Sequence, residues 1–277
     1  MSLFPRRLLP VRNTAVLMLA AAAVAGCARE GEASAEDLAA GGSAAGSGTD
    51  VPNLYLDRSL EFLVSGTPAR GGYLTQLERC HAAGMPTVAL SEADTQRIGT
   101  GRRQYWRTAD AVATREERWE MGMPSACHFE LRRVGHHAYF DAAGAIYLDL
   151  ETGDVTSEPY NPEHLSASPV EKDSSPPSPG WTGPTMREIA GQPCEQWASG
   201  EGSTVCAWAG GTKWGYSPRV TSVYDGSRQD VGSLVLDAAP PAGKTGIRVS
   251  TDAFIVGGEL DRDAMRPAEL EVGGEIR

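Results

Sequence analysis

The sequence predicts an α+β fold in which β-structure dominates: an antiparallel meander or half-barrel-like sheet with a few short helices towards its N-terminus and two disulfides. From Arg115 onward, short runs that alternate apolar and polar residues are separated by glycine-containing turns, which is typical of antiparallel strands. Before that point, apolar residues recur at helical spacing. Four cysteines stand beyond residue 50, an even number that can pair completely in an oxidising compartment.

The chain starts with the pattern of an export signal. Three arginines precede Thr14–Ala25, a mostly apolar stretch that is far shorter than the roughly 20 residues a transmembrane helix needs. The motif Val24-Ala25-Gly26-Cys27 follows. It resembles the lipobox of bacterial lipoproteins, in which the signal is removed before the cysteine and lipid, including an acyl chain such as palmitate, is attached to it. An ordinary cleaved signal is the alternative, because the residues before Gly26 are also small.

The resemblance to lipoproteins implies a cellular location for the protein. Residues 1–26 would be the signal peptide and Cys27 the lipid attachment site, so the mature chain would be anchored to a membrane of the bacterial cell envelope. Ala28 stands where lipoproteins retained in the inner membrane carry Asp, which favours the outer membrane. Residues 28–50 contain no aromatic and only one large aliphatic residue, so we expect 27–50 to be the lipidated cysteine followed by a disordered tether.

The charge of the chain excludes some partners. The precursor has 25 Lys and Arg against 36 Asp and Glu, a formal charge of −11, and removal of the signal with its three arginines leaves −14. Such acidity argues against nucleic acid and against electrostatic adhesion to anionic lipid. The membrane is therefore expected to be a partner only through the N-terminal lipid.

Residues 51–156 are expected to combine helices with antiparallel strands. Helical spacing predicts two or three short helices in the first part, through Leu60, Leu63, Val64, Leu74 and Leu77. Ser91-Glu92-Ala93-Asp94 resembles a capping box that opens a helix, which Gly99 would end. Strands follow, with a hairpin turn at Ala142-Ala143-Gly144; they are predicted at Glu117–Glu120, His128–Val134, Ala138–Asp141 and Ile146–Leu150.

A proline-rich segment divides the rest of the chain. Residues 157–184 hold seven of the eighteen prolines, which predicts a loop or a linker between two β subdomains, since proline disfavours strand and helix interiors. The β-rich segment 185–277 either forms one domain with 51–156 or stands apart. Its predicted strands are Met186–Ala190, Glu195–Ala198, Thr204–Ala209, Lys213–Tyr216, Ser233–Leu236 and Gly246–Val256. The run 185–217 resembles strand and hairpin units of periplasmic half-barrel proteins such as lipoprotein carriers.

The cysteines that remain after Cys27 predict two disulfides. Three pairings are possible, and we favour Cys80 with Cys127 and Cys194 with Cys206, because the sequence between the second pair is typical of a strand, a Gly/Ser turn and a second strand. A zinc site is the competing interpretation, but no CxxC spacing supports it.

Aromatic residues cluster near the second cysteine pair. The set Trp197, Trp208, Trp214 and Tyr216 has two interpretations: core packing beside a disulfide, or a pocket that holds an apolar ligand. The sequence alone leaves both open.

No pattern nominates a catalytic residue, a metal ligand or a cofactor. Ala238–Thr245 fits a loose phosphate-loop pattern, but two prolines remove amide donors and a strand is expected where the motif needs a helix. His136 and His137 are neighbours on a predicted strand, so they point to opposite faces and cannot both join His128 and Asp141 around one ion. Neither GxSxG nor HExxH occurs.

These observations predict an exported, membrane-anchored lipoprotein that acts without catalysis, by contact with another component of the cell envelope. The alternative is a carrier that holds a lipid or another apolar ligand in the concavity of its sheet. An envelope enzyme with no recognisable motif is the third possibility.

Overall fold

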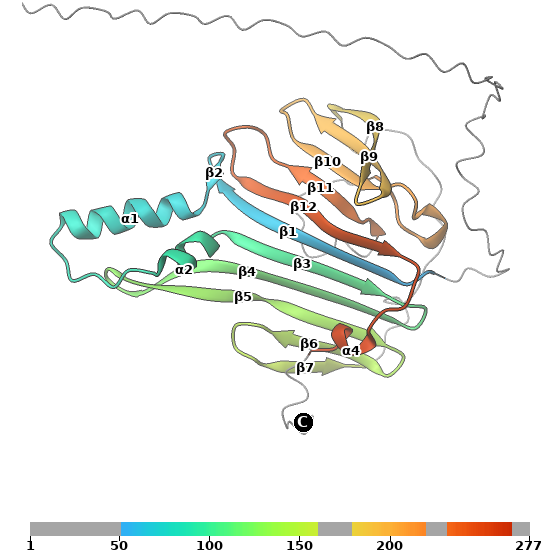
Figure 1. The fold of residues 1–277 in the computed structure, drawn as a ribbon, viewed down its shortest axis with the longest axis horizontal. Helices are drawn as coiled ribbons and strands as arrows, with labels where there is room; N and C mark the ends of the chain where they lie inside the picture. The colour runs from blue at the N-terminus through green and yellow to red at the C-terminus, as the bar shows by residue number, and fades with distance from the viewer. Residues whose placement is uncertain (1–50, 160–178, 220–231, 268–277) are drawn as a thin grey trace, which may run out of the picture. The chain divides into compact units, whose positions relative to one another are not determined.

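A computed structural model of the protein describes residues 51–159, 179–219 and 232–267. The predicted signal peptide, Cys27, the tether and most of the proline-rich segment lie outside the described residues. The described part is built on one open antiparallel sheet of 12 strands, in the order β7-β6-β5-β4-β3-β1-β12-β11-β10-β9-β8, with the short β2 beside β1 (Figure 1). The predicted fold class is confirmed.

The elements follow one another as β1 (Leu54–Val64), β2 (Thr67–Pro68), α1 (Arg70–Ala82), α2 (Glu92–Arg97), β3 (Thr100–Arg107), β4 (Ala111–Ser125), β5 (His128–Asp141), β6 (Gly144–Asp149), β7 (Val155–Glu158), β8 (Trp181–Ile189), β9 (Gln192–Ser199), β10 (Thr204–Trp208), the 3₁₀ helix η3 (Thr212–Trp214), β11 (Val235–Ala239), β12 (Gly246–Val256) and α4 (Arg262–Met265).

Two meanders make up the sheet. Strands β1 and β3 to β7 form the first, and β8 to β12 form the second; within each, strands that follow one another in the chain pair side by side. The two meanders meet where β1 pairs with β12, from Leu54 opposite Val256 to Leu63 opposite Gly246. The strands before and after the proline-rich segment therefore belong to one continuous sheet.

Two helices lie at one end of the sheet, beside the β4–β5 hairpin (Figure 1). α1 buries Tyr73 and Cys80 against Phe129 of β5. α2 starts as the capping box predicts, since the Ser91 hydroxyl accepts a hydrogen bond from the backbone N–H of Asp94 at 3.1 Å. Gly99, in the left-handed region at φ +73°, follows its C-cap.

The expected helix through Leu60, Leu63 and Val64 is wrong, because these residues belong to β1. Their spacing is compatible with a helix, but along β1 the residues Leu54, Leu56 and Leu60 are buried while Ser59 is exposed, which is strand alternation. Pairing with strands on both sides, β3 and β12, decides between the two periods.

Other predicted boundaries need correction. Glu117–Glu120 is only part of β4, and the strands predicted at His128–Val134 and Ala138–Asp141 are one strand, β5. Lys213–Tyr216 is no strand: its first part belongs to η3, and Gly215 at φ +90° ends that turn and lets Trp214 stack on Trp208, with ring centroids 5.7 Å apart. The proline-rich segment also begins and ends inside strands, β7 and β8. Pro184 is tolerated in β8 because this is an edge strand with an irregular register between Thr182 and Thr185.

The main core forms where the second meander and the segment after β10 pack against β1 and β3. It contains Leu54, Leu56, Tyr105, Trp208, Tyr216, Leu234, Leu236 and Phe254. Charged side chains are buried nearby. Arg103 forms an ion pair with Glu116 on the next strand, with Nε 2.7 Å from Oε2, and Arg58 donates a hydrogen bond to the Val235 carbonyl at 3.2 Å. These bonds satisfy polar groups that would otherwise oppose burial.

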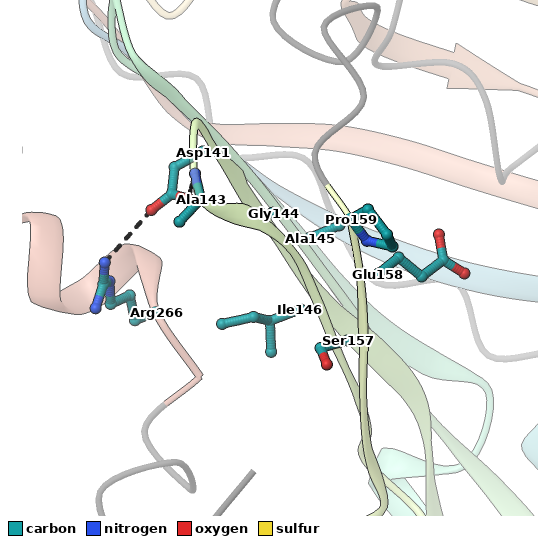
Figure 2. A pocket seen from close by; sticks show the side chains of 9 residues that line it. All are labelled: Asp141, Ala143, Gly144, Ala145, Ile146, Ser157, Glu158, Pro159 and Arg266. Carbon is teal, nitrogen blue, oxygen red and sulfur yellow. Dashed lines mark hydrogen bonds and ion pairs between the residues drawn. The ribbon is translucent and has the colours of Figure 1, made fainter. Parts of the chain in front are cut away.

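α4 fastens the chain after β12 to the first meander. The Asp261 carboxylate caps the helix, and Arg262 makes a two-point ion pair with Asp110, at 2.9 and 2.8 Å. Met265 is fully buried against Trp106 and Tyr139. Just beyond the helix, Arg266 lies opposite Asp141 (Figure 2).

The pairing of β1 with β12 leads to a stability prediction. Leu56→Ala should lower the free energy of unfolding by about 3 kcal/mol in urea titrations, because it opens a cavity in the main core. Ile255→Ala is the matched control, since Ile255 lies on β12 opposite the neighbouring Tyr55 but is 48% exposed; it should change stability by about 0.5 kcal/mol or less. Equal losses in both variants would contradict this account of the core.

Candidate functional site

Both predicted disulfides are confirmed. Cys80 pairs with Cys127, which joins α1 to the β4–β5 hairpin, and Cys194 pairs with Cys206 across β9 and β10. All four cysteines are buried. Buried disulfides of this kind support the fold, since they constrain the unfolded chain and are shielded from exchange with other thiols.

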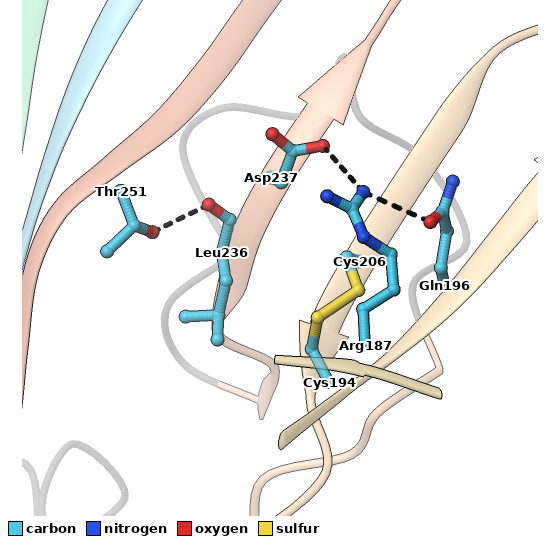
Figure 3. Close-up of a disulfide and its surroundings, with 7 residues drawn as sticks. All are labelled: Arg187, Cys194, Gln196, Cys206, Leu236, Asp237 and Thr251. Atoms are coloured by element: carbon cyan, nitrogen blue, oxygen red, sulfur yellow. Dashed lines mark hydrogen bonds and ion pairs between the residues drawn. A yellow bond between two sulfur atoms is a disulfide. The ribbon is translucent and has the colours of Figure 1, made fainter. Parts of the chain in front are cut away.

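The surface beside the second disulfide is polar. The Arg187 guanidinium reaches over β9 towards the Gln196 amide oxygen and the Asp237 carboxylate, at 3.1 and 3.8 Å (Figure 3). Burial raises the pKa of Asp237 even though Arg187 and Arg248 oppose the shift. This ion pair is partly exposed and spans the two strands between β8 and β11, so its main effect is to orient side chains on the sheet.

The aromatic set that the sequence singles out lies in the core. Trp197, Trp208 and Tyr216 are buried, and Trp208 contacts the rings of Trp214, Tyr216 and Phe254 at centroid distances of 5.0–5.7 Å. The Tyr216 hydroxyl lies 2.6 Å from that of Tyr105. Burial raises the pKa of Tyr105 well above its usual value. An apolar ligand would have to displace these contacts to reach the set.

The remaining sequence candidates are not brought together. His137 is buried, with Nε2 2.9 Å from the Met265 carbonyl oxygen, whereas its neighbour His136 is exposed. The phosphate-loop pattern is followed by β12 rather than by a helix. Within the described ranges, no group of three or more His, Cys, Asp or Glu side chains is arranged to hold a metal ion.

Exposed apolar side chains gather at the α1 end of the sheet. The last residue of β1, α1, the connection from α1 to α2, and the final part of β4 each contribute; Figure 1 shows these elements at the same end. Five large apolar residues there are at least 40% exposed, namely Val64, Leu74, Met85, Val88 and Met123. We call this set the apolar end. Elsewhere in the described part, residues of this kind are scattered over β7, β8 and β12.

The apolar end is held in place by covalent and polar contacts. Met85 Sδ lies 3.7 Å from Cys127 Sγ of the first disulfide. Val88 exchanges backbone hydrogen bonds with the start of β5, donating to the Cys127 carbonyl and accepting from the Phe129 N–H, both at 3.0 Å. The Tyr73 hydroxyl accepts from the N–H of Leu90 at 2.9 Å. These exposed side chains therefore stand on an ordered support.

A small pocket opens at the same end. Its volume is about 250 Å³, and its mostly apolar wall includes Phe62, Ala69, Ile98, Trp119 and Met121. The guanidinium of Arg97 covers one face of the Trp119 ring, 3.3 Å from its centroid, and so fixes the orientation of the indole. The pocket is of a size to admit one apolar side chain of a partner.

The apolar end could not be predicted from the sequence, because its residues follow no motif. Met85 and Val88 flank a proline in an irregular connection, and periodicity carries no information there on which side chains face solvent.

The sequence matches no model of a protein family, and no curated protein sequence is significantly similar to it. Of the helices in the described residues, none has the length and apolar character that crossing a bilayer requires.

The disulfides allow a quantitative prediction. Replacing Cys194 and Cys206 together by Ala should lower the unfolding free energy by about 3 kcal/mol, and replacing Cys80 and Cys127 together should lower it by about 4 kcal/mol. The loss is larger for Cys80–Cys127 because this disulfide closes the longer loop, with a sequence separation of 47 rather than 12. Urea titration measures both losses.

A reductant provides the control for this prediction. It should destabilise the natural protein strongly and each double variant only by the loss of its remaining disulfide. A double variant as stable as the natural protein would show that the corresponding disulfide contributes nothing to stability.

Proposed function

We propose that this chain is an exported lipoprotein, anchored in the bacterial cell envelope through Cys27, that works without catalysis by contact with another envelope component. The lipobox and the signal pattern support the proposed location in the cell envelope. The two buried disulfides are in keeping with it, because disulfides persist in exported proteins and are rare in the cytosol.

The observation that carries the proposed contact function is the apolar end. Exposed large apolar side chains normally scatter over a domain, and their concentration at one end of this sheet is typical of a protein–protein contact. Two of the five are methionines, whose flexible side chains adapt to a partner surface. The nearby pocket beside Trp119 adds a recess that an apolar side chain of the partner would fill.

The position of the apolar end suits an anchored protein. The proposed tether joins the sheet just before Leu54, where β1 begins, and Val64 stands at the other end of the same strand. An 11-residue strand spans about 36 Å. The apolar end is therefore separated, along the length of the sheet, from the residue where the proposed tether attaches. A partner could bind it while the N-terminus stays attached to the membrane.

The anchor is tested by labelling. Cells that express the protein and are fed a clickable palmitate analogue should yield a labelled protein in the outer-membrane fraction, and Cys27→Ser should lose both the label and the membrane association. Cys80→Ser is the control for general damage from removing a cysteine, and it should keep the label. An unlabelled natural protein, or an unaltered membrane fraction for Cys27→Ser, would contradict the lipoprotein proposal.

The contact function is tested by site-specific crosslinking. A photoreactive benzoylphenylalanine placed at Val88 or Met123 should give one discrete crosslinked species in intact cells. The same residue placed at the equally exposed Met186 or Ile255, away from the apolar end, should give none. Val88→Asp should reduce the adduct formed from position 123, because a charge weakens an apolar contact. No adduct at the apolar end, or the same adducts at all four positions, would count against the proposal.

A further inference from the structure

A second cavity lies between the β5–β6 turn, β7 and the residue that follows α4. It has a volume of about 530 Å³, within the range of pockets that bind small molecules. Figure 2 shows its interior: Arg266 on one side, Asp141 facing it from the end of β5, and the side chains of Ile146 and Ser157 on the sheet opposite. The Glu158 carboxylate points away from Arg266. The pocket is remote from the apolar end.

The charged pair in this pocket is built into the fold. Arg266 directly follows α4, which is held by the Arg262–Asp110 ion pair and by burial of Met265. Its guanidinium lies 5.0 Å from the centre of the Tyr139 ring. Asp141 is oriented by its own turn, since one carboxylate oxygen accepts from the backbone N–H of Ala143 at 2.8 Å. Both charges are thus positioned before any ligand arrives.

The contact between the two charged groups is loose. Arg266 Nη2 and Asp141 Oδ2 are 3.5 Å apart, and the Arg266 side chain is 58% exposed. A guanidinium has five N–H donors in a planar fork, so the contacts of Arg266 with Asp141 and with the Tyr139 hydroxyl leave further donors, which suit an acid group of a ligand. Asp141 Oδ1 accepts from the Ala143 N–H and Oδ2 faces Arg266, so an ammonium group of the ligand would share Oδ2 with Arg266 through its second lone pair.

The charge balance selects a ligand that carries both signs. A purely anionic ligand would meet Asp141 and the field of a protein with a net charge of −11. A purely cationic ligand would meet Arg266. In an α-amino acid, the carboxylate and the ammonium group sit on one carbon, so they can oppose Arg266 and Asp141 together and form an alternating square of four charges. The remaining wall, with Ala145 and Ile146, is apolar.

We propose that this pocket binds an apolar α-amino acid, with its carboxylate on Arg266, its ammonium group on Asp141 and its side chain over Ile146. The Ser157 hydroxyl offers a further hydrogen bond at the rim. This site is independent of the proposed contact function, because it uses none of the residues of the apolar end.

The test uses L-leucine as the probe and the whole purified protein in detergent. Calorimetric titration should show saturable binding with a Kd of about 1 mM or tighter. Two analogues remove one charge each: isocaproate lacks the ammonium group and isoamylamine lacks the carboxylate. Each should bind at least about tenfold more weakly than leucine. This comparison needs no protein variant, so it stands even if a substitution disturbs folding.

Variants then locate the site. Arg266→Gln and Asp141→Asn should each weaken leucine binding by about tenfold or more, and Arg248→Gln, which removes an arginine from the opposite half of the sheet, should leave it unchanged. Circular dichroism checks that each variant is folded. No binding of leucine at about 20 mM, equal binding of both analogues, or unaltered binding by a folded Arg266→Gln would each overturn the proposal.

Discussion

Pairing between β1 and β12 connects the first and the last strands of the described chain, and the architecture depends on it. Each meander alone would expose the face of its inner strand: Leu54 and Leu56 on β1, and Phe254 on β12, contribute to one shared core. Because the pairing joins residues about 190 positions apart, it can form only after a costly closure of the chain. The local hairpins on both sides, and the disulfides inside each meander, reduce the disorder that this closure has to overcome.

An element could be predicted from the sequence where its pairing partner is close along the chain, and β1, whose partner β12 is distant, could not. Hairpins are local, so the turn at Ala142-Ala143-Gly144 and the strand Gly246–Val256 followed from alternation and turn residues. β1 could not be recognised, because Leu60, Leu63 and Val64 satisfy both periods and the partner that selects the strand lies at the other end of the chain. Pairing with β3 on one side and β12 on the other overrode the local pattern.

The candidate sites could be predicted to different degrees, because only some of them join residues that are close together in the sequence. The cysteine pairing could be inferred, since a short strand–turn–strand segment brings Cys194 and Cys206 together. The apolar end and the Arg266 pocket could not. The first requires knowing that Val88 and Met123 are exposed on elements that meet in space. The second joins Asp141 to Arg266, 125 residues later, through α4. Sequence periodicity describes neither relation.

The edges of the sheet favour side-chain contact over strand addition as the way in which a partner binds. β7 has only 4 residues, and β8 carries Pro184, a shifted register, and the charged residues Arg187 and Glu188. Short edges, proline, bulges and charges all discourage another chain from pairing with a sheet. The exposed apolar residues instead concentrate at the α1 end, where a helix and a hairpin are joined by a disulfide. A partner would therefore meet a preformed surface of side chains, whose recognition needs no rearrangement of the sheet.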